Sequence, residues 1–192
     1  MPRELDTDAQ EWHERYSTFV RGFRRRVFDG TYFNSMAGGQ VGSGVNMALR
    51  RSVLQQLGPF DEALDAGTRT RSGGDSEMFS RILSSGYRIV YEPQALNWHR
   101  HRRTWRELRR MVYGYGVGVY AAWTRSFLVE HETAMLRPAL SWFVGTQLPA
   151  LIRSMLHPCS ISFDLVWSEL RGCAVGPWAY LAARREVQKA RR

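Results

Sequence analysis

The sequence predicts an α/β fold, in which helices pack on a small mixed sheet and a helical segment follows. Residues 45–49 and 87–91 are short apolar runs bounded by turn residues, as β-strands are. Around them, apolar residues recur every three to four positions, which is the period of an amphipathic helix. This helical period also dominates the C-terminal part of the chain. We therefore expect a sheet-bearing part over residues 1–103 and a helical, membrane-proximal part over residues 104–192.

The composition of the 192 residues indicates a folded protein with an anionic partner. The hydrophobic fraction of 44% excludes a disordered chain, and the charged fraction of 23% excludes a polytopic membrane protein. The formal net charge is +9, and Lys189 is the only lysine among 27 basic residues. Arginine suits phosphate and carboxylate groups, so a nucleotide diphosphate, a nucleic acid or an acidic membrane is a reasonable partner, with codon bias as the alternative. Cys159 and Cys173 form no zinc or disulfide pattern, and the N-terminus has no signal-peptide pattern, so we expect a cytoplasmic location.

Local signals place the helices. Thr7 and Gln10 have the spacing of a capping box, and the helical period that follows predicts a first helix that runs as far as Val27. A brief helix is expected from Ser52 to Gly58. Residues 65–74 are rich in Gly, Thr and Arg and predict a loop, after which a helix is expected from Asp75 to the Ser-Ser-Gly at residues 84–86.

A second capping box, formed by Thr104 and Glu107, predicts a long helix. Three glycines within it, at positions 114, 116 and 118, each cost about 1 kcal/mol relative to alanine, so we expect close packing against a neighbour or a membrane. Residues 139–156 form the longest apolar stretch and predict an interfacial or buried helix. We expect a break at Gly176-Pro177.

Several motifs follow one another in an order that resembles a known family. The stretch GSGVNMALRRSVLQQLGPFDEAL, then GGDSEMFSRILSSGYRIVYEPQALNWHRHRR, then RELRRMVYGYGVG resembles the acceptor-side half of a family 2 glycosyltransferase with the GT-A fold. The resemblance covers residues 36–120 strongly and the flanks more weakly. It implies an inverting transfer of a sugar from a nucleotide-sugar donor to a hydroxyl of a sugar or of a lipid-linked acceptor. The nucleotide-binding half of such an enzyme is not visible in the sequence, so a fragment is expected.

The resemblance implies that Asp75 is the catalytic base. A carboxylate that is ionised at neutral pH can take the proton of the acceptor hydroxyl. The alternative is that Asp75 only caps the helix that it precedes. Gly74 stands where the family often has an acidic partner, which makes Glu77 a secondary candidate for acceptor contacts, with helix orientation as its alternative role.

The resemblance also implies a divalent metal, Mn²⁺ or Mg²⁺, with His99 as a ligand. Neutral imidazole is a suitable ligand, and the metal would act as a Lewis acid on the leaving diphosphate. A packed or hydrogen-bonded histidine is the alternative. The main metal-binding Asp-x-Asp of the family is not found: Asp6-Thr7-Asp8 has the pattern, but it lies at a helix cap without a preceding strand.

Further candidate substrate contacts follow from the same resemblance or from charge. The residues are Gly44, Asn46, Asp61, Trp98, Arg100, Arg102 and Arg103. Asp61 has a turn-forming alternative, and the three arginines could pair with diphosphate or form a solvated basic face, which His101 is expected to share.

The sequence is also compatible with functions other than sugar transfer. The long helix at residue 104 has aromatic residues on one side and Arg106, Arg109 and Arg110 near its start, which favours a peripheral position on an anionic membrane surface. A noncatalytic remnant or a basic module that binds a membrane or nucleic acid is the alternative function. We expect no specific nucleic-acid partner, because no reader motif is found.

Overall fold

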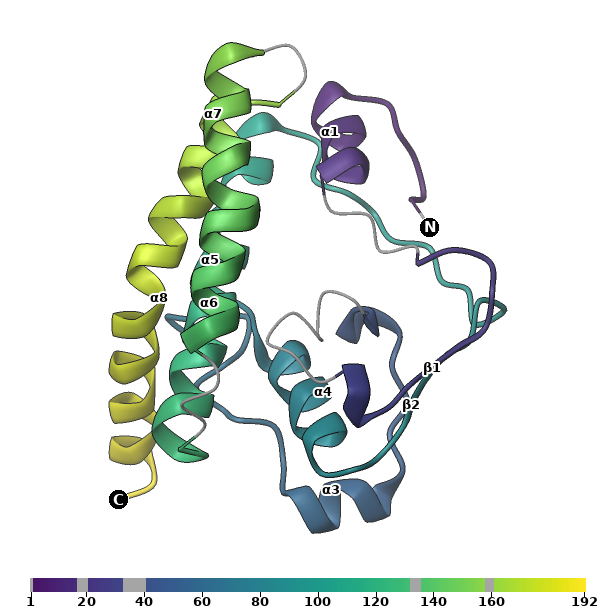
Figure 1. Cartoon of the computed structure of the whole chain (residues 1–192), viewed down its shortest axis with the longest axis vertical. Coiled ribbons are helices and arrows are strands. Elements are labelled where there is room, and N and C mark those ends of the chain that lie inside the picture. Colours follow the sequence, from purple (N-terminus) through teal and green to yellow (C-terminus); the bar gives the residue numbers. More distant parts are fainter. Residues whose placement is uncertain (1, 17–20, 33–40, 132–135, 158–160) are drawn as a thin grey trace. The chain divides into compact units, whose positions relative to one another are not determined.

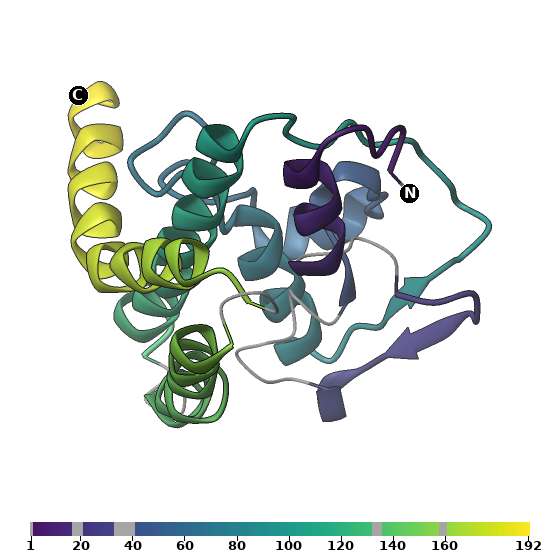
Figure 2. The ribbon, with the colours of Figure 1, turned by 90° about the horizontal axis from the view of Figure 1, so that it is seen from above.

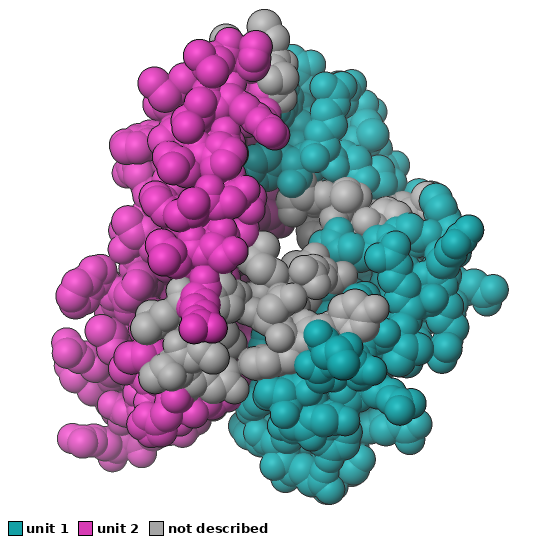
Figure 3. Space-filling model, viewed as in Figure 1, with its two compact units in different colours: residues 1–59, 78–108 teal, residues 60–77, 109–192 magenta. Residues whose placement is uncertain are grey.

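A computed structural model describes residues 2–16, 21–32, 41–131, 136–157 and 161–192. The chain divides into two compact units (Figure 3). Unit 1 consists of residues 1–59 and 78–108, and unit 2 of residues 60–77 and 109–192. Residues 60–77 thus belong to the same unit as the C-terminal helices.

The described chain is mostly helical, with a small antiparallel sheet (Figure 1). Unit 1 contains α1 (Asp8–Tyr16), β1 (Arg26–Phe28), η1 (Gly30–Tyr32), η2 (Gly44–Asn46), α3 (Arg51–Leu57) and β2 (Ile89–Tyr91). Helices α4 (Gly74–Ser84) and α5 (Trp105–Val129) contribute residues to both units. Unit 2 also holds α6 (Leu136–Trp142), the π-helical turn η4 (Phe143–Gln147), α7 (Leu148–Leu156) and α8 (Phe163–Ala190).

The sheet of the described residues has two strands, rather than the mixed sheet that the sequence predicts. Strand β1 pairs antiparallel with β2, with Val27 opposite Val90. The strand predicted at residues 87–91 is confirmed as β2, but residues 45–49 form η2 and an irregular segment. Side-chain amides explain the difference: Asn46 Nδ2 donates to Ala95 O at 2.6 Å, and Asn97 Nδ2 donates to Val45 O at 3.1 Å. The side-chain amides of Asn46 and Asn97 therefore occupy backbone carbonyls that would accept from the backbone N–H groups of a neighbouring strand in a sheet.

The first helix is shorter than the prediction. The capping box is confirmed, because Gln10 Oε1 accepts from Thr7 N at 3.1 Å. However, α1 ends at Tyr16, and residues 26–28 form β1 instead of a last helical turn. Gly22 has φ +94°, a left-handed conformation that no right-handed helix contains. Of the described apolar residues in this pattern, Val27 pairs with Val90 of β2, and Phe23 is exposed.

The other predicted helices of the first 130 residues are confirmed. Helices α3 and α4 occupy their predicted positions, and α5 begins directly after Thr104. The second capping box is formed, since Thr104 N donates to Glu107 Oε2 at 3.2 Å and Glu107 N donates to Thr104 Oγ1 at 3.3 Å. The polar segment 65–73 is a series of turns, as predicted.

In unit 2 the glycines allow α5 and α8 to approach closely. A Cβ at Gly116 would clash with the carbonyl oxygen of Glu169, and one at Gly172 would clash with the carbonyl oxygen of Tyr113. A Cβ at Gly176 would lie 2.7 Å from Val117 O. The predicted close packing of the long helix is therefore confirmed, and its partner is α8. On the predicted apolar side of α5, Leu108 and Val112 are buried, whereas Trp105, Tyr115 and Val119 are partly exposed.

Helix α8 does not break at Gly176-Pro177, contrary to the prediction. It continues to Ala190 and changes direction within its length (Figure 2). A proline removes one backbone donor and crowds the preceding turn, so it bends a helix that is otherwise held by packing. The close contact of Gly176 with α5 provides that packing. None of the helices in the described ranges is long and apolar enough to cross a membrane.

Candidate functional site

The segment before Asp75 is fixed against the body of unit 2. Gly73 has φ +111°, and a Cβ there would lie 2.6 Å from the carbonyl oxygen of Gly118 on α5. The Ser72 hydroxyl donates to Gly114 O at 2.9 Å. Only glycine fits at position 73, because both the backbone conformation and the distance to α5 exclude a side chain. The start of α4 therefore has a defined place on α5.

Asp75 lies in the first turn of α4 and is half-buried. Its Oδ1 accepts from the backbone N of Ser76 at 2.8 Å. This bond holds the carboxylate near the helix N-terminus, where the backbone dipoles favour a negative charge. Asp75 lies inside α4, which begins at Gly74, so it is not the N-cap residue that the alternative reading of the sequence predicts.

The departure from the family pattern at Gly74 has a steric reason. A Cβ at this position would clash with the carbonyl oxygen of Leu64. An acidic residue at position 74 would require the turn at Leu64 to move. The next carboxylate along the helix is Glu77, which is buried.

Glu77 and Asp61 are both bound by Arg125 of α5. Arg125 Nη1 lies 2.7 Å from Glu77 Oε1, and Arg125 Nε lies 2.9 Å from Asp61 Oδ2. Glu130 Oε1 approaches Arg125 Nη1 at 2.6 Å, and the hydroxyl of Tyr180 donates to Asp61 Oδ2 at 3.1 Å. We call these five residues the Arg125 cluster.

The electrostatics of the Arg125 cluster follow from its burial. Burial disfavours the charged guanidinium, but the neighbouring Glu77, Glu130 and Asp61 outweigh it and raise the pKa of Arg125. Burial, together with the negative charge of Asp61, raises the pKa of Tyr180. Arg125 therefore stays charged, and Tyr180 stays a neutral donor.

The contacts that the sequence predicts for Asp61 and Glu77 are with substrate, whereas their observed partners are within the protein. Asp61 Oδ1 also accepts from Ala63 N at 2.9 Å, which agrees with the turn-forming alternative. Substrate contacts by Asp61 and Glu77 remain a prediction. Sequence reasoning missed Arg125 and Tyr180. The one available signal is that Arg125 follows the apolar residues 121–123 on a helix.

Unit 1 contains a cavity of about 340 Å³ next to its sheet. The lining comes from three segments: residues 41–43 and 45–49, residues 89–93 and residues 95–97, with Gly22, Phe23 and Phe79 completing it. The predicted contact residue Asn46 is among the lining residues, and Gly44 beside it begins η2. Asn46 and Asn97 tie two of these segments together through the bonds described above. The cavity has the size and the mixed polar and apolar lining of a small-molecule site.

Three histidines meet in unit 1. The ring centroids of His13 and His101 are 4.0 Å apart, and His99 Nδ1 lies 3.2 Å from His101 Nδ1. His101 Nε2 lies 2.9 Å from Glu14 Oε2. The prediction that His101 lies on a solvated basic face is wrong, because its side chain is buried beneath α1 residues. His13, which the sequence did not single out, is also buried.

The histidine cluster predicts a loss of stability in acid. Burial, with smaller contributions from His101, His99 and Arg102, lowers the pKa of His13 from 6.5 to about 4. Below pH 6.5 His13 is protonated in the unfolded chain, whereas in the folded chain it stays neutral until the pH falls to about 4. The contribution of neutral His13 to the free energy of unfolding is therefore complete above pH 6.5. It falls by up to about 3 kcal/mol as the pH is lowered to 4.

The measurement is urea unfolding of the wild type, of His13→Leu and of His157→Gln at a series of pH values between 7 and 4. His157 is exposed and serves as the control. His13→Leu should flatten the pH dependence, whereas His157→Gln should keep the wild-type slope. Equal slopes for His13→Leu and the wild type would contradict the shifted pKa.

The remaining predicted contacts lie on the segment around the histidine cluster. Trp98 is 69% exposed, so its ring is accessible for stacking. Arg103 pairs with Glu4 at 3.0 Å and with Asp6 at 3.1 Å, and Arg100 lies 3.4 Å from Glu4. Arg102 is exposed. Two of the three arginines therefore already contact carboxylates, which fits the solvated-face alternative.

The described residues do not assemble a metal centre around His99. They contain no group of three or more His, Cys, Asp or Glu side chains placed to hold one ion. Asp6 and Asp8 of the Asp-x-Asp pattern lie at the start of α1, and Asp6 is paired with Arg103. The predicted metal at His99 thus needs ligands from outside the described residues.

The comparisons with known proteins give one partial match. A 63-residue stretch is 33% identical to "Probable glycosyltransferase YdaM" of Bacillus subtilis (strain 168). The match covers 33% of this chain and 13% of the relative. No protein-family model matches the chain. No solved structure matches it either. The similarity supports a glycosyltransferase relationship and nothing finer.

Proposed function

We propose that this chain carries the acceptor-side part of an inverting glycosyltransferase of the family 2, GT-A type, with Asp75 as its general base. One observation carries the proposal: a half-buried Asp75 is held on α4 by a turn that admits only glycine at position 73, in a chain with a stretch similar to a probable glycosyltransferase. A fixed carboxylate is what general-base catalysis requires, because the acceptor hydroxyl must be held against it.

The proposed reaction is a single displacement. As the acceptor oxygen attacks the anomeric carbon of the nucleotide-sugar, its proton passes to the Asp75 carboxylate. The bond from the anomeric carbon to the diphosphate oxygen breaks, and the nucleoside diphosphate leaves with the electron pair. The configuration at the anomeric carbon is inverted. Asp75 then loses its proton to solvent.

The other predicted residues have binding roles in this proposal. The cavity with Asn46 and Gly44 is the candidate site for a sugar ring, and Trp98 has an exposed face on which a sugar can stack. Arg102, with Arg100 and Arg103 beside it, is the candidate contact for the diphosphate. The acceptor is a sugar or a lipid-linked hydroxyl. The donor-binding half is supplied by a segment outside this sequence.

A turnover experiment tests the class of function. The chain, and the natural protein that contains it, are incubated with UDP-, GDP- and dTDP-sugars, and the release of nucleoside diphosphate is followed with and without a lipid extract as the acceptor source. The proposal predicts release that depends on both one donor and the extract. A natural protein that releases no diphosphate from any donor, but binds arbitrary oligonucleotides in a salt-sensitive way, would contradict it and favour the basic-module alternative.

A further inference from the structure

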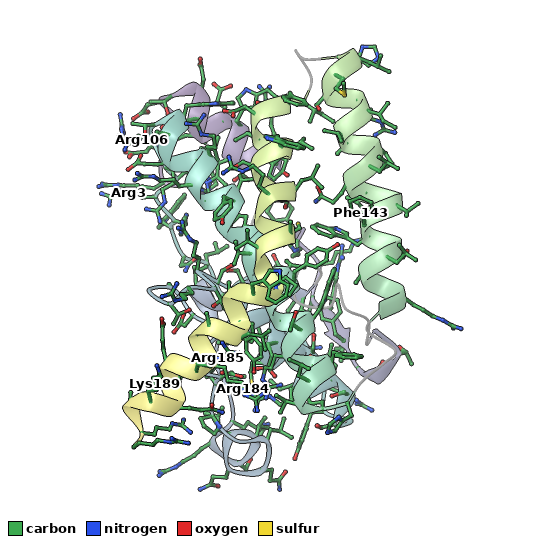
Figure 4. All side chains as sticks on the ribbon, turned by 90° about the vertical axis from the view of Figure 1, so that its left-hand side faces the viewer. Arg3, Arg106, Phe143, Arg184, Arg185 and Lys189 are labelled. Carbon is green, nitrogen blue, oxygen red and sulfur yellow. The ribbon has the colours of Figure 1, made fainter. Side chains whose placement is uncertain are left out.

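The segment from α6 through α7 in unit 2 has its apolar side outward. Six residues at helical spacing make up what we call the α6–α7 apolar face: Leu140, Val144, Leu148, Ile152, Met155 and Leu156. Met155 and Leu156 are each 68% exposed. Figure 4 shows Phe143, 41% exposed, on the same segment. A helix on the surface of a protein in water normally has the opposite orientation, with its apolar stripe against the core.

The inward side of the segment is polar and is held in place. Gln147 and Ser154 are buried, although both are polar. Gln147 Nε2 donates to Glu169 Oε2 of α8 at 2.8 Å, and Ser154 Oγ donates to Leu151 O at 2.7 Å. Rotation of the helix to hide its apolar side would break the bond to Glu169 and leave a buried carboxylate without it, which is unfavourable. The outward apolar face is therefore a fixed feature of unit 2.

The charges beside this face select its partner. The sequence from Leu136 to Phe163 contains Arg137 and Arg153 and not one Asp or Glu. Both arginines are exposed. Two copies of the chain that met face to face would bring these cations together without a carboxylate from the same segment to neutralise them. An anionic bilayer provides both an apolar interior for the face and phosphate groups for the arginines.

We propose that the α6–α7 apolar face lies in the surface of an anionic lipid bilayer, with the helix parallel to the membrane plane. The apolar side chains enter the boundary between headgroups and acyl chains, and Arg137 and Arg153 pair with lipid phosphate. The sequence predicts an interfacial or buried helix over residues 139–156, and the exposed apolar side of this segment favours the interfacial alternative; the arginine-based membrane surface predicted on α5 is a different one. The inference does not rest on the proposed function, because the same face would bind lipid in a noncatalytic protein.

Vesicle sedimentation tests the proposal. The full chain is mixed with vesicles of phosphatidylcholine containing 30 mol% phosphatidylglycerol, or of phosphatidylcholine alone, at 0.1 M salt. We expect the chain to bind the anionic vesicles and to bind the neutral vesicles more weakly. The double variant Ile152→Glu/Met155→Glu should bind at least about tenfold more weakly, because two apolar side chains no longer enter the bilayer. The variants Arg137→Gln and Arg153→Gln should each bind about fivefold more weakly to the anionic vesicles.

Matched controls separate the face from general basic adsorption. Leu5→Glu introduces one negative charge, half the charge of the double variant, at an exposed apolar residue of unit 1, and Arg110→Gln removes an exposed arginine from α5. Both should bind like the wild type, and circular dichroism should show equal helix content in all variants. Absence of wild-type binding, or equal binding of the Ile152→Glu/Met155→Glu variant, would overturn the proposal. A wild-type dimer without lipid that becomes a monomer in this variant would also overturn it, in favour of a second copy of the chain.

Discussion

Replacement of Asp75 by asparagine is expected to lower kcat of sugar transfer about 10²–10⁴-fold, the usual contribution of a general base. Asparagine has nearly the same shape and can still accept from the Ser76 amide through its side-chain oxygen, but it cannot take the acceptor proton. The dissociation constant of the nucleotide-sugar should stay within about twofold of the wild type, because the donor does not depend on this carboxylate in the proposed reaction. The measurement is initial-rate kinetics at saturating donor, with donor binding by calorimetry, in the natural protein that contains this chain.

Asp65→Asn provides the matched control for this prediction. Asp65 is exposed, lies in the same unit, and like Asp75 accepts from the amide of the residue that follows it, at 2.6 Å. Its replacement should leave kcat unchanged. Equal activities of Asp75→Asn and Asp65→Asn would remove Asp75 from the role of base and leave it only its bond to the Ser76 amide.

The largest loss of stability is expected for Arg125→Met. The arginine contacts three carboxylates in a site that is nearly closed to water, and its removal leaves their charges uncompensated. Removal of one partner from a buried ion pair typically lowers the free energy of unfolding by about 3–5 kcal/mol. Methionine fills a similar volume, so the loss arises from charge and not from a cavity. Urea unfolding at pH 7 measures the effect.

Arg109→Met is the control for Arg125→Met. Arg109 pairs with Asp164 at 3.1 Å at the surface, where an ion pair contributes about 1 kcal/mol or less. Addition of Glu77→Gln to Arg125→Met should recover part of the lost stability, because it removes the most deeply buried of the three charges. A loss for Arg125→Met no greater than that for Arg109→Met would contradict the description of the Arg125 cluster as a buried ion network.

Local signals explain how much of the fold could be predicted. The capping boxes at Thr7 and Thr104 act within four residues, and the structure contains both. Helix α4 begins beside Asp75 as expected, and the polar segment before it is a loop. In each case the determining bonds join neighbours in the sequence, so the sequence pattern is sufficient.

Features that depend on distant residues could not be predicted. The pairing of β1 with β2 joins Val27 to Val90, and the left-handed Gly22 that ends the helical pattern has no unique sequence signature. The burial of His13 and His101 depends on α1 lying against the segment of His99 within unit 1. The hydrogen bonds that the side-chain amides of Asn46 and Asn97 donate take the place of strand pairing at residues 45–49, although the apolar pattern of this segment is typical of a strand.

The candidate site shows the same distinction. Asp75 is predicted from a motif on one short segment, and its role as a base stays a prediction. Arg125 cannot be predicted in this way, since its partners Asp61 and Glu77 are 64 and 48 residues away and come together with it only when unit 2 folds. Pro177 predicts a break in the helix, yet α8 continues, because packing of Gly176 against α5 outweighs the local preference.

The anomeric configuration of the sugar product tests the proposed single displacement most directly. The product is formed by the natural protein from a donor of known configuration. Proton NMR then measures the coupling constant between the anomeric proton and the proton on the neighbouring carbon. Direct attack by an acceptor that Asp75 deprotonates gives the configuration opposite to that of the donor. A product that keeps the donor's configuration would contradict this mechanism.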